Sequence, residues 1–242
     1  MLLKKASADG ISFLETTLPN LIKERLAKTK VVGFDLDGTL ADSMEIRAKL
    51  FAATISDFAP ETSSYQPQIA ELFFQVTLGK SRFQLIEEAF KTFANQTPNE
   101  AQIKQISLAF TEKYSQVDLP LFEDAIQTLK NLTQKGYFLF LSSTTPQESL
   151  GVDIKKHGIG HYFALTLGFR EGFTKETHHL PYVSKILKTP TSQFIFVGDG
   201  QIDILAAKKS GAFGVAKTNG RKINWQVQPD IIISHLTTLQ SL

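Results

Sequence analysis

The sequence predicts an α/β fold in which a doubly wound parallel sheet, Rossmann-like in plan, carries a small α-helical cap domain as an insertion. Short apolar runs such as 31–34 and 194–197 alternate with amphipathic segments, a pattern typical of parallel strands covered by helices on both faces. Residues 42–117 contain no convincing strand and show only helical spacing. Polar residues follow directly after the main apolar runs, where ligand sites of such sheets lie.

The chain divides into an N-terminal extension, a core in two parts and an inserted cap. Residues 11–28 place apolar side chains at helical spacing, so residues 1–29 are expected to form a helical extension. The core is expected at 30–41 and 118–242, and the helical cap at 42–117. Four successive helices are expected in the cap, with two apolar stripes formed by Phe83, Ile86, Phe90 and Phe93 and by Ile103, Ile106 and Phe110.

Strands and helices are expected to alternate again after Pro120. Apolar runs predict strands at 137–141 and 194–197, a short strand near 163–166, and weaker strands near 213–216 and 231–233. Helical spacing predicts four helices between these strands. They lie near 122–135, in a segment that ends at about 157, at 180–188 and at 202–209.

Composition limits the classes of function. The 26 basic and 24 acidic residues nearly balance, so no nucleic-acid partner is expected. Because the chain has no cysteine, disulfides, thiolate nucleophiles and Cys-bound zinc are excluded. The sequence shows neither a signal peptide nor an apolar window approaching the roughly 18 residues that cross a bilayer. A cytoplasmic protein without a membrane partner is expected, as a monomer or a homodimer.

The residues that follow the predicted strands form a candidate site. Asp35 and Asp37 follow the first strand, Ser142, Ser143 and Thr144 follow the second, and Asp199 and Asp203 follow a later one. Lys175 lies between the last two strands. Parallel neighbouring strands would bring these groups to one edge of the sheet. Four carboxylates with a hydroxyl and an ammonium group describe a site for Mg²⁺ and a phosphate.

These motifs, in their order, resemble those of the haloacid dehalogenase-like phosphohydrolases. The resemblance covers roughly residues 30–220 and consists of Asp-x-Asp-Gly-Thr-Leu at 35–40, a strand followed by Ser142, then Lys175, then Gly-Asp-x-x-x-Asp at 198–203. The insert at 42–117 matches the place where that family carries its small helical cap. The layout is similar to the phosphoglycolate-phosphatase and beta-phosphoglucomutase types.

The resemblance implies a role for each residue. Asp35 would attack phosphorus and form an aspartyl-phosphate, and Asp37 would act as general acid and base. Asp35, the main-chain carbonyl of Asp37, Asp199 and Asp203 would hold Mg²⁺. Ser142 and Lys175 would bind the phosphoryl group during catalysis, with Thr39 and Ser143 as further substrate-binding residues.

Two positions depart from the family pattern. Ser143 stands where the family often has Asn, so either Ser142 or Thr144 could make the phosphate contact; Ser142 is favoured because it follows the strand at once. Glu176 stands where Pro often follows the lysine, and Lys185 is the alternative to Lys175.

A cap segment, Leu78-Gly79-Lys80-Ser81-Arg82, precedes a predicted helix. It resembles the cap loop that reaches the active site in related phosphatases and sugar-phosphate mutases. Lys80 and Arg82 are therefore candidate substrate-binding residues, and Ser81 as an ordinary helix cap is the alternative. The adjacent His178 and His179 do not share a helix face and are expected in a loop.

The function expected from these observations is Mg²⁺-dependent hydrolysis of a small phosphorylated metabolite. A phosphosugar mutase of the beta-phosphoglucomutase type is the first alternative. A phosphonoacetaldehyde-hydrolase-like enzyme would need a cap lysine such as Lys80 to form a Schiff base with the substrate. A non-catalytic binding module of the same fold is the alternative outside enzymes, and the presence of both Asp35 and Asp37 argues against it.

Overall fold

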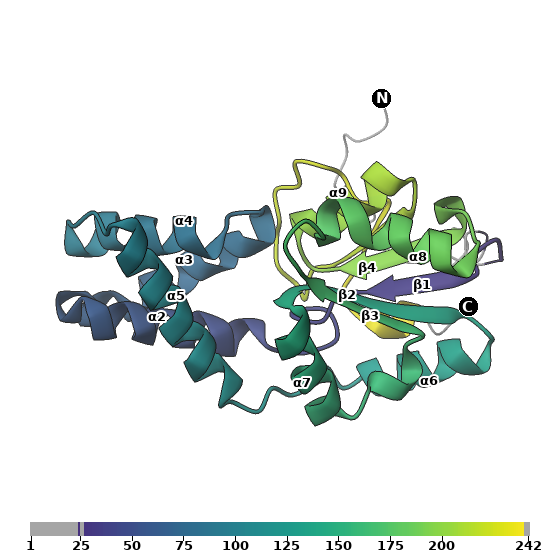
Figure 1. Cartoon of the computed structure of the whole chain (residues 1–242), viewed down its shortest axis with the longest axis horizontal. Helices are drawn as coiled ribbons and strands as arrows, with labels where there is room; N and C mark the ends of the chain where they lie inside the picture. Colours follow the sequence, from purple (N-terminus) through teal and green to yellow (C-terminus); the bar gives the residue numbers. More distant parts are fainter. Residues whose placement is uncertain (1–23, 25–26, 240–242) are drawn as a thin grey trace, which may run out of the picture.

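A parallel sheet forms the centre of the computed structural model, which describes Glu24 and residues 27–239 (Figure 1). Within these residues the sheet has six strands in the order β3-β2-β1-β4-β5-β6. The strands are β1 (Val31–Phe34), β2 (Phe138–Pro146), β3 (Leu165–Phe169), β4 (Phe194–Gly198), β5 (Phe213–Lys217) and β6 (Ile231–Ile233). The doubly wound parallel sheet predicted from the sequence is confirmed.

The strand order has its reversal beside β1. Strand β1 pairs on one side with β2 and on the other with β4, so that Phe34 lies level with Leu141 and Val197. The chain proceeds outward from β1 in one direction through β2 and β3, and in the other through β4, β5 and β6. Crevices at such a reversal, outside the carboxyl ends of the strands, are the usual ligand sites of this architecture.

Helices cover both faces of the sheet (Figure 1). Helices α6 (Ala125–Gln134) and α7 (Gln147–His157) pack on one face against alternate residues of the strands, including Val32, Phe34 and Leu141. Helices α8 (Leu180–Leu187) and α9 (Gln201–Ser210) pack on the other face with Val31 and Phe196. Strands buried on both sides explain why their sequences are continuous apolar runs.

Gly33 allows two aromatic rings to pack across the middle of β1. A Cβ atom at this position would lie 2.2 Å from Cζ of Phe140 and 2.6 Å from Cδ2 of Phe196. Those two rings stack with centroids 5.7 Å apart. The glycine is therefore required by the packing of the strands that support the site.

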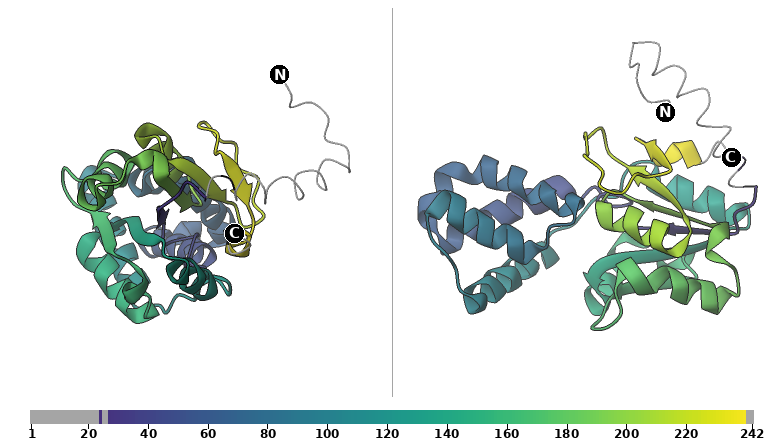
Figure 2. Two further views of the ribbon diagram at one scale, coloured as in Figure 1. Left: turned by 90° about the vertical axis from the view of Figure 1, so that its right-hand side faces the viewer. Right: turned by 90° about the horizontal axis from the view of Figure 1, so that it is seen from above.

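The inserted residues form a separate helical cap beside the sheet (Figure 2). Its helices are α2 (Met44–Phe58), α3 (Gln66–Phe73), α4 (Arg82–Ala89) and α5 (Glu100–Ser115), with short helical turns η1 (Pro60–Tyr65), η2 (Phe74–Leu78) and η3 (Phe90–Ala94). The cap has its own apolar core, in which the rings of Phe51, Phe73 and Phe110 meet at 5.2 to 6.1 Å. Two crossing segments join cap and core, and the N–H of Asp42 donates to the carbonyl of Pro120 at 2.8 Å.

Several sequence expectations need correction. Phe83 does not belong to an apolar stripe, because the buried face of α4 centres on Leu85, Ile86 and Ala89 and leaves Phe83 47% exposed. The short strand predicted near 163–166 lies at 165–169, since a 3₁₀ turn occupies Gly160–Tyr162. The expected extension at 1–29 lies mostly outside the described residues. In the described part of the chain no helix is long and apolar enough to cross a membrane.

Candidate active site

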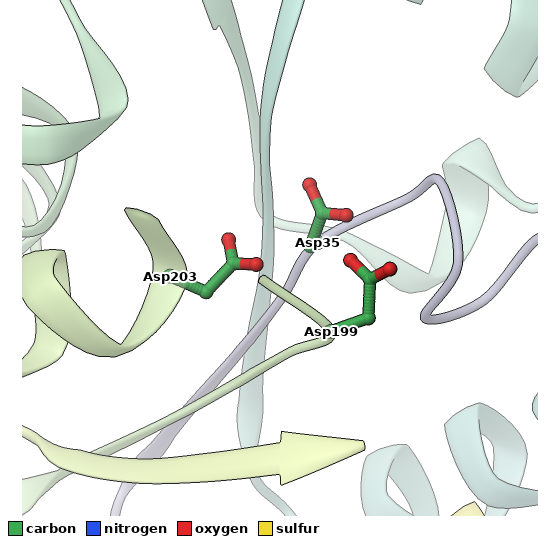
Figure 3. A group of neighbouring side chains, drawn as sticks. All are labelled: Asp35, Asp199 and Asp203. Carbon is green, nitrogen blue, oxygen red and sulfur yellow. The ribbon is translucent and has the colours of Figure 1, made fainter. Parts of the chain in front are cut away.

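Three buried aspartates meet at the carboxyl edge of the sheet (Figure 3). Asp35 follows β1, Asp199 follows β4, and Asp203 lies in the first turn of α9. Each offers a carboxylate oxygen within 4.8 Å of the others. The structure therefore brings together three of the four carboxylates that the sequence suggested.

Local structure fixes this acidic group. The N–H of Asp35 donates to the carbonyl of Val197 at 2.9 Å, which continues the strand pairing by one residue. Asp203 accepts a hydrogen bond from the N–H of Gly200 at 2.9 Å and so caps the start of α9. At Gly198 a Cβ atom would lie 2.1 Å from Cγ of Asp203. The Gly-Asp-x-x-x-Asp spacing thus places both carboxylates of this motif.

Gly38, like Gly198, lets the main chain pass close to one of the aspartates. Its φ of +77° lies in the left-handed region, and a Cβ atom there would lie 2.1 Å from Oδ2 of Asp199. A larger residue at this position would both strain the loop and displace the carboxylate.

Lys175 is the cation of this group. Its ammonium is buried and donates to Oδ1 of Asp35 and, at 2.6 Å, to Oδ1 of Asp203. Burial opposes its positive charge, but Asp203 and Asp35 outweigh that effect and raise the pKa of Lys175. Lys185, the alternative lysine, is exposed on α8. The geometry therefore favours Lys175.

One ammonium does not balance three carboxylates. Burial raises the pKa of Asp35 to about 7, with Asp203 adding to the shift and Lys175 opposing it. Burial and the neighbouring Asp35 raise the pKa of Asp199 well above its usual value. A divalent cation would relieve this repulsion, and an all-oxygen donor set suits Mg²⁺. The residues present therefore fit such an ion.

The Asp37 side chain lies apart from the acidic group, in contact with three groups from the connection to the cap and from the cap itself. Its carboxylate accepts hydrogen bonds from Ser43 Oγ at 2.7 Å and Tyr114 OH at 2.6 Å, and pairs with Arg47 at 2.7 Å. Burial favours the neutral form, but Arg47, Tyr114 and Ser43 together lower the pKa of Asp37. Its expected metal contact, through the main-chain carbonyl, stays a prediction.

Ser142 lies inside β2, because that strand runs to Pro146. Its hydroxyl is buried and lies 2.8 Å from Nδ1 of His179. Burial and the charge of Lys175 lower the pKa of His179 to about 4, so the ring is neutral. A neutral ring can fix the direction of the hydroxyl. Since Thr144 is exposed, the structure favours Ser142.

The other substrate-binding candidates of the core lie close by. Thr39 is fully buried, and in the described part of the chain its hydroxyl has no hydrogen-bond partner. Ser143 is buried and accepts from the N–H of Thr145 at 3.1 Å. Their roles toward a substrate stay predictions.

The cap candidates Lys80 and Arg82 point to cap partners. Lys80 pairs with Glu88 at 2.6 Å near the surface. Arg82 donates to Thr111 Oγ1 at 2.7 Å and to Ser107. Ser81 forms a capping box with Gln84 at the start of α4, so the capping interpretation of that serine is right. A contact of either cation with substrate stays a prediction.

A second chain of polar contacts supports the loop that carries Gly38. Lys217 is buried, and burial lowers its pKa to about 8. It donates to Oδ1 of Asn219, and Nδ2 of Asn219 donates to the carbonyl of Gly38 at 2.7 Å. Beside it, a cavity of about 250 Å³ between cap and core reaches Asp199. The strand end at β5 thus contributes to the site as well.

Sequence reasoning missed these supporting residues to different degrees. Ser43 and Arg47 are four residues apart and so lie on the same face of a helix that begins near Ser43. This spacing is a local signal that both side chains face the loop of Asp37. Tyr114 lies 77 residues from Asp37, and His179 lies 37 residues from Ser142. No local pattern indicates contacts at such separations.

Comparison with known proteins agrees with this geometry. The family model described as haloacid dehalogenase-like hydrolase matches residues 32–217. The phosphoglycolate phosphatase of Pasteurella multocida is 30% identical over 207 residues, which cover 82% of this chain and 90% of the relative. The phosphoglycolate phosphatase of Mannheimia succiniciproducens is 28% identical, covering 87% of this chain and 96% of the relative.

A solved structure shows the same fold. A Haemophilus somnus protein described as a predicted phosphoglycolate phosphatase superposes with a TM-score of 0.70 at 23% identity, covering 87% of this chain and 96% of the other. Motifs, site geometry, family model and relatives therefore agree. The chain belongs to the haloacid dehalogenase-like hydrolase family and is a phosphatase of that family.

Proposed function

We propose that this phosphatase hydrolyses a small phosphorylated metabolite in a Mg²⁺-dependent reaction that proceeds through an aspartyl-phosphate on Asp35. The observation that carries the proposal is the buried contact of Asp35 with Lys175 and two further carboxylates. The absence of cysteine and the small, partly closed cavity are compatible with a cytoplasmic enzyme for small substrates. The phosphoglycolate phosphatases among the relatives make phosphoglycolate the first substrate to test.

Asp35 is the proposed nucleophile. Its carboxylate is held at the end of a buried strand, where Lys175 orients one oxygen. Attack on phosphorus would form the acyl phosphate and break the bond to the leaving oxygen. Lys175 and the hydroxyl of Ser142 would stabilise the negative charge on the phosphoryl oxygens. His179 positions that hydroxyl through its neutral ring.

Asp37 is the proposed general acid and base. It lies two residues beyond the nucleophile, at the boundary between cap and core. Protonated, it would donate its proton to the leaving oxygen; ionised, it would accept a proton from the water that attacks the acyl phosphate. Arg47 and Tyr114 lower its pKa and so favour the ionised form in the substrate-free chain. Donation therefore requires that substrate changes these contacts.

Asp35, Asp199 and Asp203 would hold Mg²⁺ together with the main-chain carbonyl of Asp37. The ion supplies positive charge that stabilises phosphoryl transfer and neutralises the carboxylates around it.

No contact in the described residues favours the alternative functions. Arg82, whose Gly-x-Ser-Arg context suggested a mutase, donates to neutral groups of Ser107 and Thr111, and these contacts do not distinguish a mutase from a phosphatase. Lys80, the candidate for Schiff-base chemistry, pairs with Glu88. Phosphatase activity is the function that accounts for all the residues of the observed site.

Phosphate release tests the proposal. The assay compares p-nitrophenyl phosphate, phosphoglycolate and a panel of sugar phosphates, with Mg²⁺ or with EDTA, for the wild type and Asp35→Asn. We expect activity that needs the metal and is lost in the variant. Activity that survives Asp35→Asn would contradict the nucleophile, and a bisphosphate requirement would indicate a mutase. Folding of each variant is checked by circular dichroism.

A further inference from the structure

Two cap arginines lie next to each other beside Asp37. The guanidinium of Arg47 lies 4.9 Å from the ring centroid of Tyr114, and that of Arg82 lies 4.6 Å from the ring centroid of Phe110. The two rings belong to successive turns of α5 and stack with centroids 6.1 Å apart. Stacking on rings four residues apart therefore holds the two cations on the same face of α5.

One carboxylate forms an ion pair with these two cations in the described residues, while Asp35 and Asp199 act on Arg47 from farther away and, with Asp37, raise its pKa. Arg47 pairs with Asp37 through one terminal nitrogen at 2.7 Å. The hydrogen-bond partners found for Arg82 are neutral: the carbonyl and hydroxyl of Ser107 at 3.3 Å and the hydroxyl of Thr111 at 2.7 Å. Burial and the charge of Arg47 lower the pKa of Arg82 to about 10. The two guanidinium groups thus have one ion-pair partner among the described residues, the carboxylate of Asp37.

Arg47 also has an unused donor. Its Nε is buried and, among the described residues, has no hydrogen-bond partner. A buried donor without a partner is unfavourable, so this N–H is available to bind a ligand. The guanidinium is flat and presents its donors in a fork that matches the two oxygens of a carboxylate.

We propose that Arg47 and Arg82 form a cap subsite that binds a second negatively charged group of the substrate, a carboxylate close to the phosphate ester. This rests on the proposed function, and it adds the residues that select the substrate. Asp37, which would donate to the leaving oxygen, touches Arg47, so the bound group belongs to the leaving alcohol and lies near its oxygen. Phosphate esters of short hydroxy acids have this arrangement.

A simpler role for Arg47 is a contact that only holds cap and core together. The two roles differ in which substrates they affect. Loss of a cap–core contact, or a change at Asp37, lowers turnover of every phosphate ester by a similar factor. Loss of a carboxylate subsite lowers turnover only of esters that carry the carboxylate. The ratio of kcat/KM between two matched esters therefore separates them.

Phosphoglycolate and ethyl phosphate are such a pair, because a methyl group replaces the carboxylate. We expect the wild type to favour phosphoglycolate by at least about 10-fold in kcat/KM, as one charged hydrogen-bonded contact provides. Arg47→Met and Arg82→Met keep the side-chain length and remove the charge. Each should reduce that preference by about 10-fold or more, mainly through phosphoglycolate. Arg47→Lys should retain part of it.

Lys156→Met is the matched control. Lys156 on α7 also joins core to cap, donating to the carbonyl of Ser115 at 3.1 Å and pairing with Asp118 at 3.8 Å. Its loss removes one cationic cap–core contact that does not involve Asp37 and should leave the preference at the wild-type ratio. A wild type that hydrolyses both esters equally, or a preference unchanged in Arg47→Met, would overturn the subsite.

Binding separates this proposal from the proposed function. In an Asp35→Asn background, phosphoglycolate should raise the unfolding temperature more than ethyl phosphate does, and Arg47→Met should remove the difference. If binding depends on Arg47 while the Asp35 enzyme releases no phosphate from any ester, the subsite stands and the hydrolytic function fails. If neither ester binds, the subsite is wrong.

Discussion

Asp35→Asn should stabilise the metal-free protein at neutral and alkaline pH even as it removes activity. Asp35 is 6% exposed, and burial raises its pKa from 3.8 to about 7. Three pKa units correspond to about 4 kcal/mol of unfolding free energy lost by keeping this carboxylate ionised. The attraction of Lys175 is already included in this raised pKa, and asparagine keeps an oxygen that can accept from Lys175. The expected gain is therefore about 4 kcal/mol.

The pH dependence of this gain has a definite sign. A carboxyl group whose pKa is raised on folding binds its proton more tightly in the folded chain, so wild-type stability falls as pH rises from about 4 to about 7. The variant lacks this loss. The two proteins should be equally stable near pH 4 and differ by the full amount above about pH 7.

Thermal unfolding in EDTA across this pH range measures the effect. For a chain of this length, about 4 kcal/mol corresponds to roughly 8 to 16 °C in Tm. Mg²⁺ should raise the Tm of the wild type more than that of the variant, because the variant offers one carboxylate fewer. Asp57→Asn, an exposed residue of the cap, is the control and should change neither. A variant less stable than the wild type near pH 8 would refute the repulsion argument.

Three further substitutions test the residues that surround Asp35, the proposed nucleophile. Lys175→Met should lower kcat by about 100-fold or more and destabilise the metal-free chain by about 3 to 5 kcal/mol, since two buried carboxylates lose their cation; denaturant titration with and without Mg²⁺ measures the second effect. Asn219→Ala should lower kcat several-fold while thermal stability falls by about 1 kcal/mol, because Gly38 loses the amide that holds its carbonyl; unchanged kcat would show that this contact is only structural. Gly198→Ala should weaken Mg²⁺ affinity measured by calorimetry, because its Cβ displaces Asp203; wild-type affinity would contradict the tight fit.

The fold and the acidic group could be predicted because their signals are local. Asp35 and Asp199 each follow a continuous apolar run, and the parallel sheet brings the ends of those runs together. Asp203 is four residues beyond Asp199 on the turn that begins α9, so its place follows from helix geometry. For these residues, sequence spacing alone determines which atoms can meet.

The surroundings of Asp37 could not be predicted in the same way. Its contacts with Tyr114 and Arg47 depend on how the cap lies over the core, and no pattern in either segment encodes that orientation. The same limit explains Phe83, whose exposure follows from the packing of α4 on the other cap helices. His178 and His179 lie in a helical turn rather than a loop, and only His179 is buried, beside Ser142.

The central claim is that Asp35 becomes phosphorylated, and mass spectrometry of the enzyme under turnover tests it most directly. Wild-type protein is mixed with phosphoglycolate or p-nitrophenyl phosphate and Mg²⁺, stopped in acid within one turnover, and digested. We expect the mass of one phosphoryl group on the peptide that carries Asp35, sensitive to hydroxylamine and absent in Asp35→Asn. A phosphoryl group on another residue, or steady hydrolysis with an enzyme that never carries one, would contradict the mechanism.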